Sequence, residues 1–148
     1  MFHVGMWRER MRDSLTAAID GRDYEPPGAR DAINDSELAA GIGTPLGDAA
    51  ARADHLLTEI VGLFEKVGDR PVQWFASVSA DDAVLRNSYA HPRSHICEYL
   101  AVNGDVTQAR KLLEDALDEL GRLSAPEYVT TVLAGLREDP RFKDPTQS

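Results

Sequence analysis

The stretch TPLGDAAARADHLLTEIVGLFEKVG, residues 44–68, decides the fold class of this chain. Its apolar side chains fall on a single stripe when they are projected at about 100° per residue, the period of an α-helix. The stripe contains Leu46, Ala49, Ala50, Ala53, Leu56, Leu57, Ile60, Phe64 and Val67. Thr44 followed by Pro45 is typical of an N-cap and a first helical position, and Gly68 is typical of a helix end. We therefore expect a long amphipathic helix that buries one face.

Helical periodicity continues on both sides of this stretch. The further predicted helices cover residues 2–20, residues 79–103, a segment that opens at Asp105, and residues 124–137, with a short helix at 31–40. Gly21 is expected to end the first of them, which has no visible N-cap. The pairs Ser79/Asp82 and Asp105/Gln108 have the spacing of capping boxes. Pro92 lies inside the third long helix and predicts a kink or a break there.

These helices predict the fold class and the domain organisation. No alternating strand run or hairpin signal is found, so we expect an all-α helical bundle. The length of 148 residues fits one domain, which we place at residues 1–137. Residues 138–148 are rich in acidic residues and proline, and we expect them to form a mobile tail.

Composition limits the partners and the cellular location. The formal net charge is -9, from 16 basic and 25 acidic residues. Such a surface repels nucleic acid phosphates and anionic membranes, so neither is an expected partner. The single cysteine, Cys97, rules out an intrachain disulfide and fits a cytoplasmic location. The N-terminus has neither a signal-peptide pattern nor a membrane-spanning run.

Two histidines carry the strongest chemical signal in the sequence. His91 and His95 are four residues apart, which places both imidazoles on one face of a helix. Two such nitrogens can share one metal ion, although the HExxH motif of zincins is absent. The alternative is a pair of partly buried histidines that hydrogen-bond to neighbours without a metal. Pro92 between them leaves their relative direction open.

The other histidines and the cysteine are expected to play different parts. His55 projects away from the apolar stripe of its helix and is expected to face solvent. His3 lies at the edge of the stripe that holds Trp7, so it can point toward another helix. Cys97 projects more than about 100° from the two histidines, which makes a Cys–His nucleophile pair improbable and a packing role expected. The sequence has no phosphate-binding glycine loop, serine nucleophile elbow or CxxC zinc pattern.

Three segments resemble the DinB-like (damage-inducible) four-helix-bundle superfamily over residues 1 to about 120. NSYAHPRSHI, residues 87–96, is similar to its HxxxH helix. AIND and PLGD, residues 32–35 and 45–48, with the helix up to Val67, are similar to its third helix and the approach to it. HVGMWRER, residues 3–10, is similar to its second helix, in which tryptophan follows a histidine by four positions.

The resemblance implies an antiparallel bundle with one long crossover, a homodimer, and a divalent metal held by His3, His91 and His95. The family has a further helix before the one with the first histidine, so this chain is expected to lack that helix or to have it truncated. Without that helix, apolar surface of the bundle would be exposed, which is a second reason to expect a partner subunit. The family includes thiol-dependent transferases and isomerases that use bacillithiol or mycothiol, and members with no known activity.

The sequence therefore supports two functional hypotheses. In the first, zinc, nickel, iron or copper activates a low-molecular-weight thiol or water, which attacks a small electrophile in a transferase or hydrolase reaction. Nearby candidates for a base or a substrate-orienting group are Tyr89, Arg93, Glu98 and Tyr99. In the second, the protein is a non-catalytic helical bundle that binds a small molecule or a partner protein.

Overall fold

The computed structural model describes residues 1–25, 30–75, 77 and 79–142, and every regular element within them is a helix. The one β-type contact in these residues is an isolated bridge between Trp74 and Ser77. The all-α prediction is therefore confirmed for the described part of the chain. Internal contacts divide the chain into two compact units, Met1–Val84 and Leu85–Ser148. The single domain predicted over residues 1–137 stays a prediction, as do the antiparallel arrangement and the DinB-like type.

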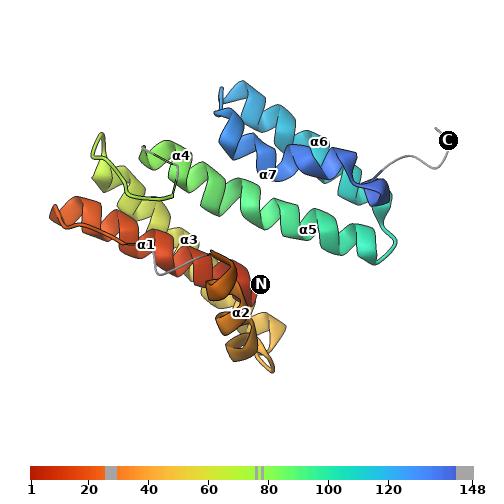
Figure 1. The fold of residues 1–148 in the computed structure, drawn as a ribbon, viewed down its shortest axis with the longest axis horizontal. Coiled ribbons are helices and arrows are strands. Elements are labelled where there is room, and N and C mark those ends of the chain that lie inside the picture. Colours follow the sequence, from red (N-terminus) through yellow and green to blue (C-terminus); the bar gives the residue numbers. More distant parts are fainter. Residues whose placement is uncertain (26–29, 76, 78, 143–148) are drawn as a thin grey trace. The chain divides into compact units, whose positions relative to one another are not determined.

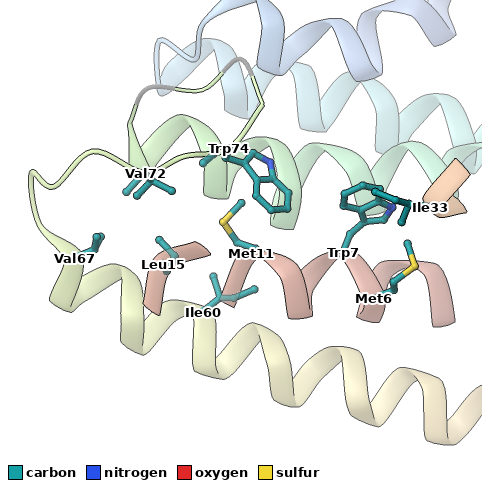
Figure 2. Close-up of a cluster of buried hydrophobic side chains, with 11 residues drawn as sticks. Met6, Trp7, Met11, Leu15, Ile33, Ile60, Val67, Val72 and Trp74 are labelled. Carbon is teal, nitrogen blue, oxygen red and sulfur yellow. The ribbon is translucent and has the colours of Figure 1, made fainter. Parts of the chain in front are cut away.

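The N-terminal unit contains α1 (Phe2–Asp20), α2 (Arg30–Gly41), α3 (Leu46–Val67) and the short α4 (Ala80–Val84). The two long helices, α1 and α3, pack side by side (Figure 1). Figure 2 shows the core between them and the loop that follows α3. This core contains Met6, Trp7, Met11, Leu15, Ile33, Ile60, Val67, Val72, Trp74, Ala80 and Ala83. Each of its large side chains stabilises the unit by about 1.5–3 kcal/mol relative to an exposed position.

Small residues allow α1 and α3 to approach closely. A Cβ atom on Gly5 would lie 3.8 Å from the Cβ atom of Ala53 on the facing helix. Close to this contact, Nη1 of the buried Arg8 donates a hydrogen bond of 2.7 Å to the carbonyl oxygen of Ala53. The chain leaves α1 through Gly21, whose φ of 66° is the left-handed conformation expected at a helix end.

The start of α3 differs from the prediction. Thr44 was expected to cap this helix, but the helix begins at Leu46, with Pro45 in the cap position and no side-chain cap bond. The reason is that the amide of Thr44 donates to the carbonyl oxygen of Gly41, so Thr44 belongs to the turn after α2. Leu46 is 72% exposed and does not join the buried face. That face consists of Ala49, Ala53, Leu56, Ile60 and Val67.

The C-terminal unit begins with a π-helix, η1 (Leu85–Ala90), which leads directly into α5 (His91–Val102). The helical run that starts after Ser79 thus changes its hydrogen-bonding register just before Pro92. Proline has no amide hydrogen for the regular helical ladder, and a π-turn accommodates such a gap. The predicted cap is confirmed, because the Ser79 hydroxyl oxygen accepts from the amide of Asp82 at 3.2 Å. The predicted kink or break at Pro92 takes the form of this π-helix.

Two further helices, α6 (Val106–Arg122) and α7 (Glu127–Glu138), pack with α5 and complete the core of this unit. Asp105 caps α6 as predicted, accepting from the amide of Gln108 at 3.1 Å. The start of α7 near Ser124 was predicted too early. Ser124 has a left-handed φ of 53°, and the amide of Ala125 returns to the carbonyl oxygen of Leu120 at 3.0 Å. Ser124 therefore belongs to the turn that closes α6.

The chain after α7 remains packed through Phe142. Pro140–Phe142 forms a 3-10 turn, η2, and the Phe142 side chain is 5% exposed against the core of the C-terminal unit. Nε of Arg110 on α6 donates to the Phe142 carbonyl oxygen. Residues 138–142 of the predicted tail are thus part of the packed unit, and residues 143–148 lie outside the described residues. Among the described residues, none of the helices is long and apolar enough to cross a membrane.

Candidate metal centre

The two histidines of α5 converge on each other. Nε2 of His91 and Nε2 of His95 lie 2.9 Å apart, and the ring centroids are separated by 4.7 Å. The rings meet at 70°, so the two nitrogens approach from different directions instead of stacking. His91 is half-buried, and the side chain of His95 is 44% exposed. The expectation that both imidazoles share one helix face is confirmed.

The separation of the two nitrogens is compatible with one divalent ion. With metal–nitrogen bonds of about 2.0–2.1 Å, two ligands lie about 2.9 Å apart at a right angle and about 3.4 Å apart at a tetrahedral angle. The observed 2.9 Å falls at the lower end of this range. Neutral imidazole nitrogens suit zinc, nickel, iron and copper. The donor set and its geometry therefore fit a transition-metal ion.

The same distance also fits a direct hydrogen bond. At 2.9 Å, the Nε2–H of one neutral imidazole can donate to the lone pair on Nε2 of the other. In that state the pair needs no metal, and the two rings hold each other in place. The two interpretations of the sequence therefore differ in which tautomers the rings adopt.

Glu98 lies behind His95, on the side opposite its converging nitrogen. Its carboxylate is 3.6 Å from Nδ1 of His95. A carboxylate at Nδ1 favours the tautomer in which Nδ1 carries the proton, which leaves Nε2 free of hydrogen for a metal. Glu98 is in turn 3.8 Å from Nη2 of Arg141 in η2. Burial lowers the pKa of His95 and the Glu98 carboxylate raises it, with a net lowering that favours the neutral form needed for a ligand.

The local backbone around His91 is held by the π-helix and by α7. The Ser94 hydroxyl donates to the carbonyl oxygen of His91 at 2.7 Å. Within η1, Arg86 donates from Nη1 to the carbonyl oxygen of Tyr128 on α7, and its guanidinium lies 5.7 Å from the centroid of the Tyr128 ring. These contacts attach the segment before the histidines to a second helix. π-turns of this kind are frequent at functional sites.

His3, the third predicted ligand, belongs to α1 in the N-terminal unit. Its side chain is half-buried. Its ring meets the ring of Trp7 edge to face, with the centroids 6.2 Å apart. This agrees with the expectation that His3 lies at the edge of the apolar stripe of its helix. His3 and the pair on α5 are in different units, and the assignment of His3 to one site with His91 and His95 stays a prediction from the resemblance.

The structure also places the other residues that the sequence analysis singled out. Arg93 stacks over the ring of Tyr89 at 3.5 Å and donates to the Tyr89 carbonyl oxygen at 3.3 Å. Tyr99 is 68% exposed. The prediction that Cys97 is a packing residue is confirmed, since it is fully buried and burial raises the pKa of its thiol to about 11. His55 is 75% exposed, as expected.

Sequence reasoning missed two contributors to this site. Arg141 was assigned to a mobile tail, although the apolar Phe142 beside it was a signal that the chain returns to the core. The contact of Arg86 with α7 was also missed, because nothing in a helical projection identifies a π-helix. Glu98 was among the sequence candidates, and its carboxylate contacts His95.

Comparisons with known proteins found no family model, no curated relative and no solved structure that matches the chain. The DinB-like assignment therefore stays a prediction that depends on the quoted motifs.

Proposed function

We propose that this protein is a metal-dependent helical protein of the DinB-like type, in which a divalent ion activates a low-molecular-weight thiol or water for attack on a small electrophile. The convergence of the two Nε2 atoms of His91 and His95 at 2.9 Å is the observation that carries the proposal. The third ligand in this proposal is His3, from α1, and this part is supported by the sequence resemblance alone.

The chain's own residues have distinct tasks in this proposal. A bound divalent ion supplies a Lewis acid that lowers the pKa of a thiol or water toward neutrality. His91 and His95 hold the ion as neutral imidazoles. Glu98 is a positioning residue that fixes the tautomer of His95 through Nδ1. The exposed Tyr99, one turn beyond His95 on the same helix, is available to contact a substrate.

The decisive experiment measures metal content and metal affinity. Untagged protein is analysed by elemental mass spectrometry as purified and after incubation with zinc or nickel, followed by desalting. Cobalt(II) titration adds a second readout, because its visible absorption reports ligand number and geometry. The variants are His91→Ala, His95→Ala, the double variant and His3→Ala. His55→Ala is the matched control, because it removes an exposed imidazole on α3.

The outcomes separate the parts of the proposal. Near-stoichiometric metal that is lost in the double variant and retained in His55→Ala supports the α5 site and justifies thiol-transfer assays. A weaker cobalt spectrum in His3→Ala supports the third ligand, and an unchanged spectrum excludes it. Wild-type protein that takes up no metal, with a double variant of equal stability, sinks the metal proposal.

In that last case the second candidate function takes precedence. A direct hydrogen bond between His91 and His95 also accounts for the 2.9 Å separation. The protein would then be a non-catalytic bundle that binds a small molecule or a partner protein. Nitrogen-15 chemical shifts of the two imidazoles distinguish this state, because one Nε2 carries a proton and the other accepts it.

A further inference from the structure

The N-terminal unit contains a connected group of aromatic rings, which we call the aromatic cluster: Trp7, Trp74 and Phe75. The ring centroids of Trp7 and Trp74 are 6.1 Å apart, those of Trp7 and Phe75 are 5.8 Å apart, and those of Trp74 and Phe75 are 5.3 Å apart. Trp7 and Trp74 are both buried (Figure 2). The Trp74 ring meets the rings of Trp7 and Phe75 nearly edge to face, at 88° and 77°, and the rings of Trp7 and Phe75 meet at 56°, which are attractive aromatic arrangements.

Phe75 differs from its two partners in exposure and in backbone conformation. Its side chain is 48% exposed, although the adjacent Trp74 is 4% exposed. Its φ is 47°, in the left-handed region that bulky residues rarely adopt. A glycine or asparagine would meet this turn geometry at lower cost. Residues held in such conformations are concentrated at ligand-binding and active sites. The conformation presents an aromatic ring to solvent on a buried aromatic support.

The size and charge of this surface define the ligand class. One half-exposed ring is far smaller than the roughly 800 Å² per partner of a stable protein interface, so the scale is that of a small molecule. The guanidinium of Arg30 lies 5.7 Å from the centroid of Phe75, and that of Arg10 lies 5.4 Å from the ring of Trp7. Arg10 is paired with Glu37, whereas the Arg30 charge beside Phe75 repels a cationic ligand, so a neutral or anionic planar ring is favoured.

We propose that the aromatic cluster binds the planar ring of a neutral or anionic small molecule, with Phe75 as the residue that contacts the ligand. Ring stacking on Phe75 needs nothing from the C-terminal unit.

Intrinsic fluorescence tests this proposal directly, because both tryptophans of the chain belong to the cluster. Neutral 4-nitrobenzyl alcohol is the probe, since its electron-poor ring quenches tryptophan on contact. The titration is repeated with the cation 4-nitrobenzyltrimethylammonium and, as a competitor, with the saturated alcohol cyclohexylmethanol. Protein treated with EDTA and the His91→Ala/His95→Ala variant are titrated alongside, so that failure of the metal site and failure of the aromatic cluster are read separately.

Substitutions at Phe75 test whether its aromatic ring binds the ligand. Phe75→Leu keeps apolar volume and removes the ring, and we expect binding weaker by on the order of tenfold. Phe75→Tyr keeps the ring and should retain wild-type affinity. Leu123→Ala removes an exposed apolar side chain after α6 and is the control. Thermal unfolding checks that each variant is folded.

Saturable quenching that survives EDTA and is weakened only in Phe75→Leu supports the proposal. Purely collisional quenching, equal affinity of Phe75→Leu and wild type, or tighter binding of the cation overturns it.

Discussion

Arg86 of the π-helix donates a hydrogen bond to the carbonyl oxygen of Tyr128 on α7 and stacks against the same residue's ring. This contact joins the segment that precedes the histidine pair to α7. Replacement by alanine leaves a partly buried carbonyl without this donor, at a cost of about 1–3 kcal/mol in the free energy of unfolding. Urea denaturation of Arg86→Ala measures the loss. Arg122→Ala, at the exposed end of α6, is the control, and equal stability of the two variants would count against the role of Arg86.

Pro92 gives a second prediction, which separates stability from metal binding. Pro92→Ala supplies an amide hydrogen near the start of α5, so the π-helix can return to regular helical bonding. We expect an unfolding free energy equal to or higher than that of the wild type. We also expect cobalt affinity to fall by on the order of tenfold, because the register that positions His91 is altered. A variant that binds cobalt as tightly as the wild type would show that the π-helix does not position the ligands.

Two glycines provide a test of the packing between α1 and α3. An alanine at Gly5 places its Cβ at 3.8 Å from that of Ala53, which is ordinary contact, and an alanine at Gly62 meets nothing within 4 Å. Both substitutions improve helix propensity, so each should raise the unfolding free energy by about 0.5–1 kcal/mol. Gly5→Leu should instead separate the helices and lower the unfolding free energy by more than this gain. Thermal unfolding of the three variants checks the prediction, which fails if Gly5→Leu matches Gly5→Ala.

Asp139 predicts a specific dependence on pH. Its carboxylate accepts from the Arg141 side chain and from the Arg141 amide, and these bonds lower its pKa from 3.8 to about 2. Because the pKa is lower in the folded state, the contribution to stability is present above the unfolded-state pKa and is lost as the pH falls from 3.8 toward 2. Carbon-13 NMR titration of the carboxyl group should show this low midpoint. Arg141→Gln should raise it toward the ordinary range, although the backbone amide of residue 141 still donates, and an unchanged midpoint would refute the assignment.

The ends of a helix could be predicted where residues close to that end in the sequence determine them. Both ends of α1 were predicted, because an apolar stripe and Gly21 define them without reference to the rest of the chain. The cap of α6 was predicted for the same reason, since Asp105 and Gln108 are near neighbours. Thr44 and Ser124 were each expected to begin the next helix, but each lies in the turn that closes the preceding one. The residue types alone do not determine which of these two structures forms.

The candidate site was predictable only in the part that lies on one helix. Spacing of four residues brings His91 and His95 together, whatever surrounds them. The support from Arg86 and Arg141 depends on contacts across 42 and 43 residues of sequence, and helical periodicity carries no information on these. The π-helix is likewise a response of the backbone to Pro92 and to packing, and the sequence indicated only a kink or a break there.

The confinement of both tryptophans to the aromatic cluster has a thermodynamic consequence. Tryptophan emission reports unfolding of the N-terminal unit alone, whereas three of the four tyrosines, Tyr89, Tyr99 and Tyr128, are in the C-terminal unit. Far-ultraviolet circular dichroism reports the helices of both. Coincident denaturation curves from these signals identify one cooperative folding unit, and separate midpoints identify two. The placement of two residues thus lets ordinary spectroscopy count the folding units of the chain without any label.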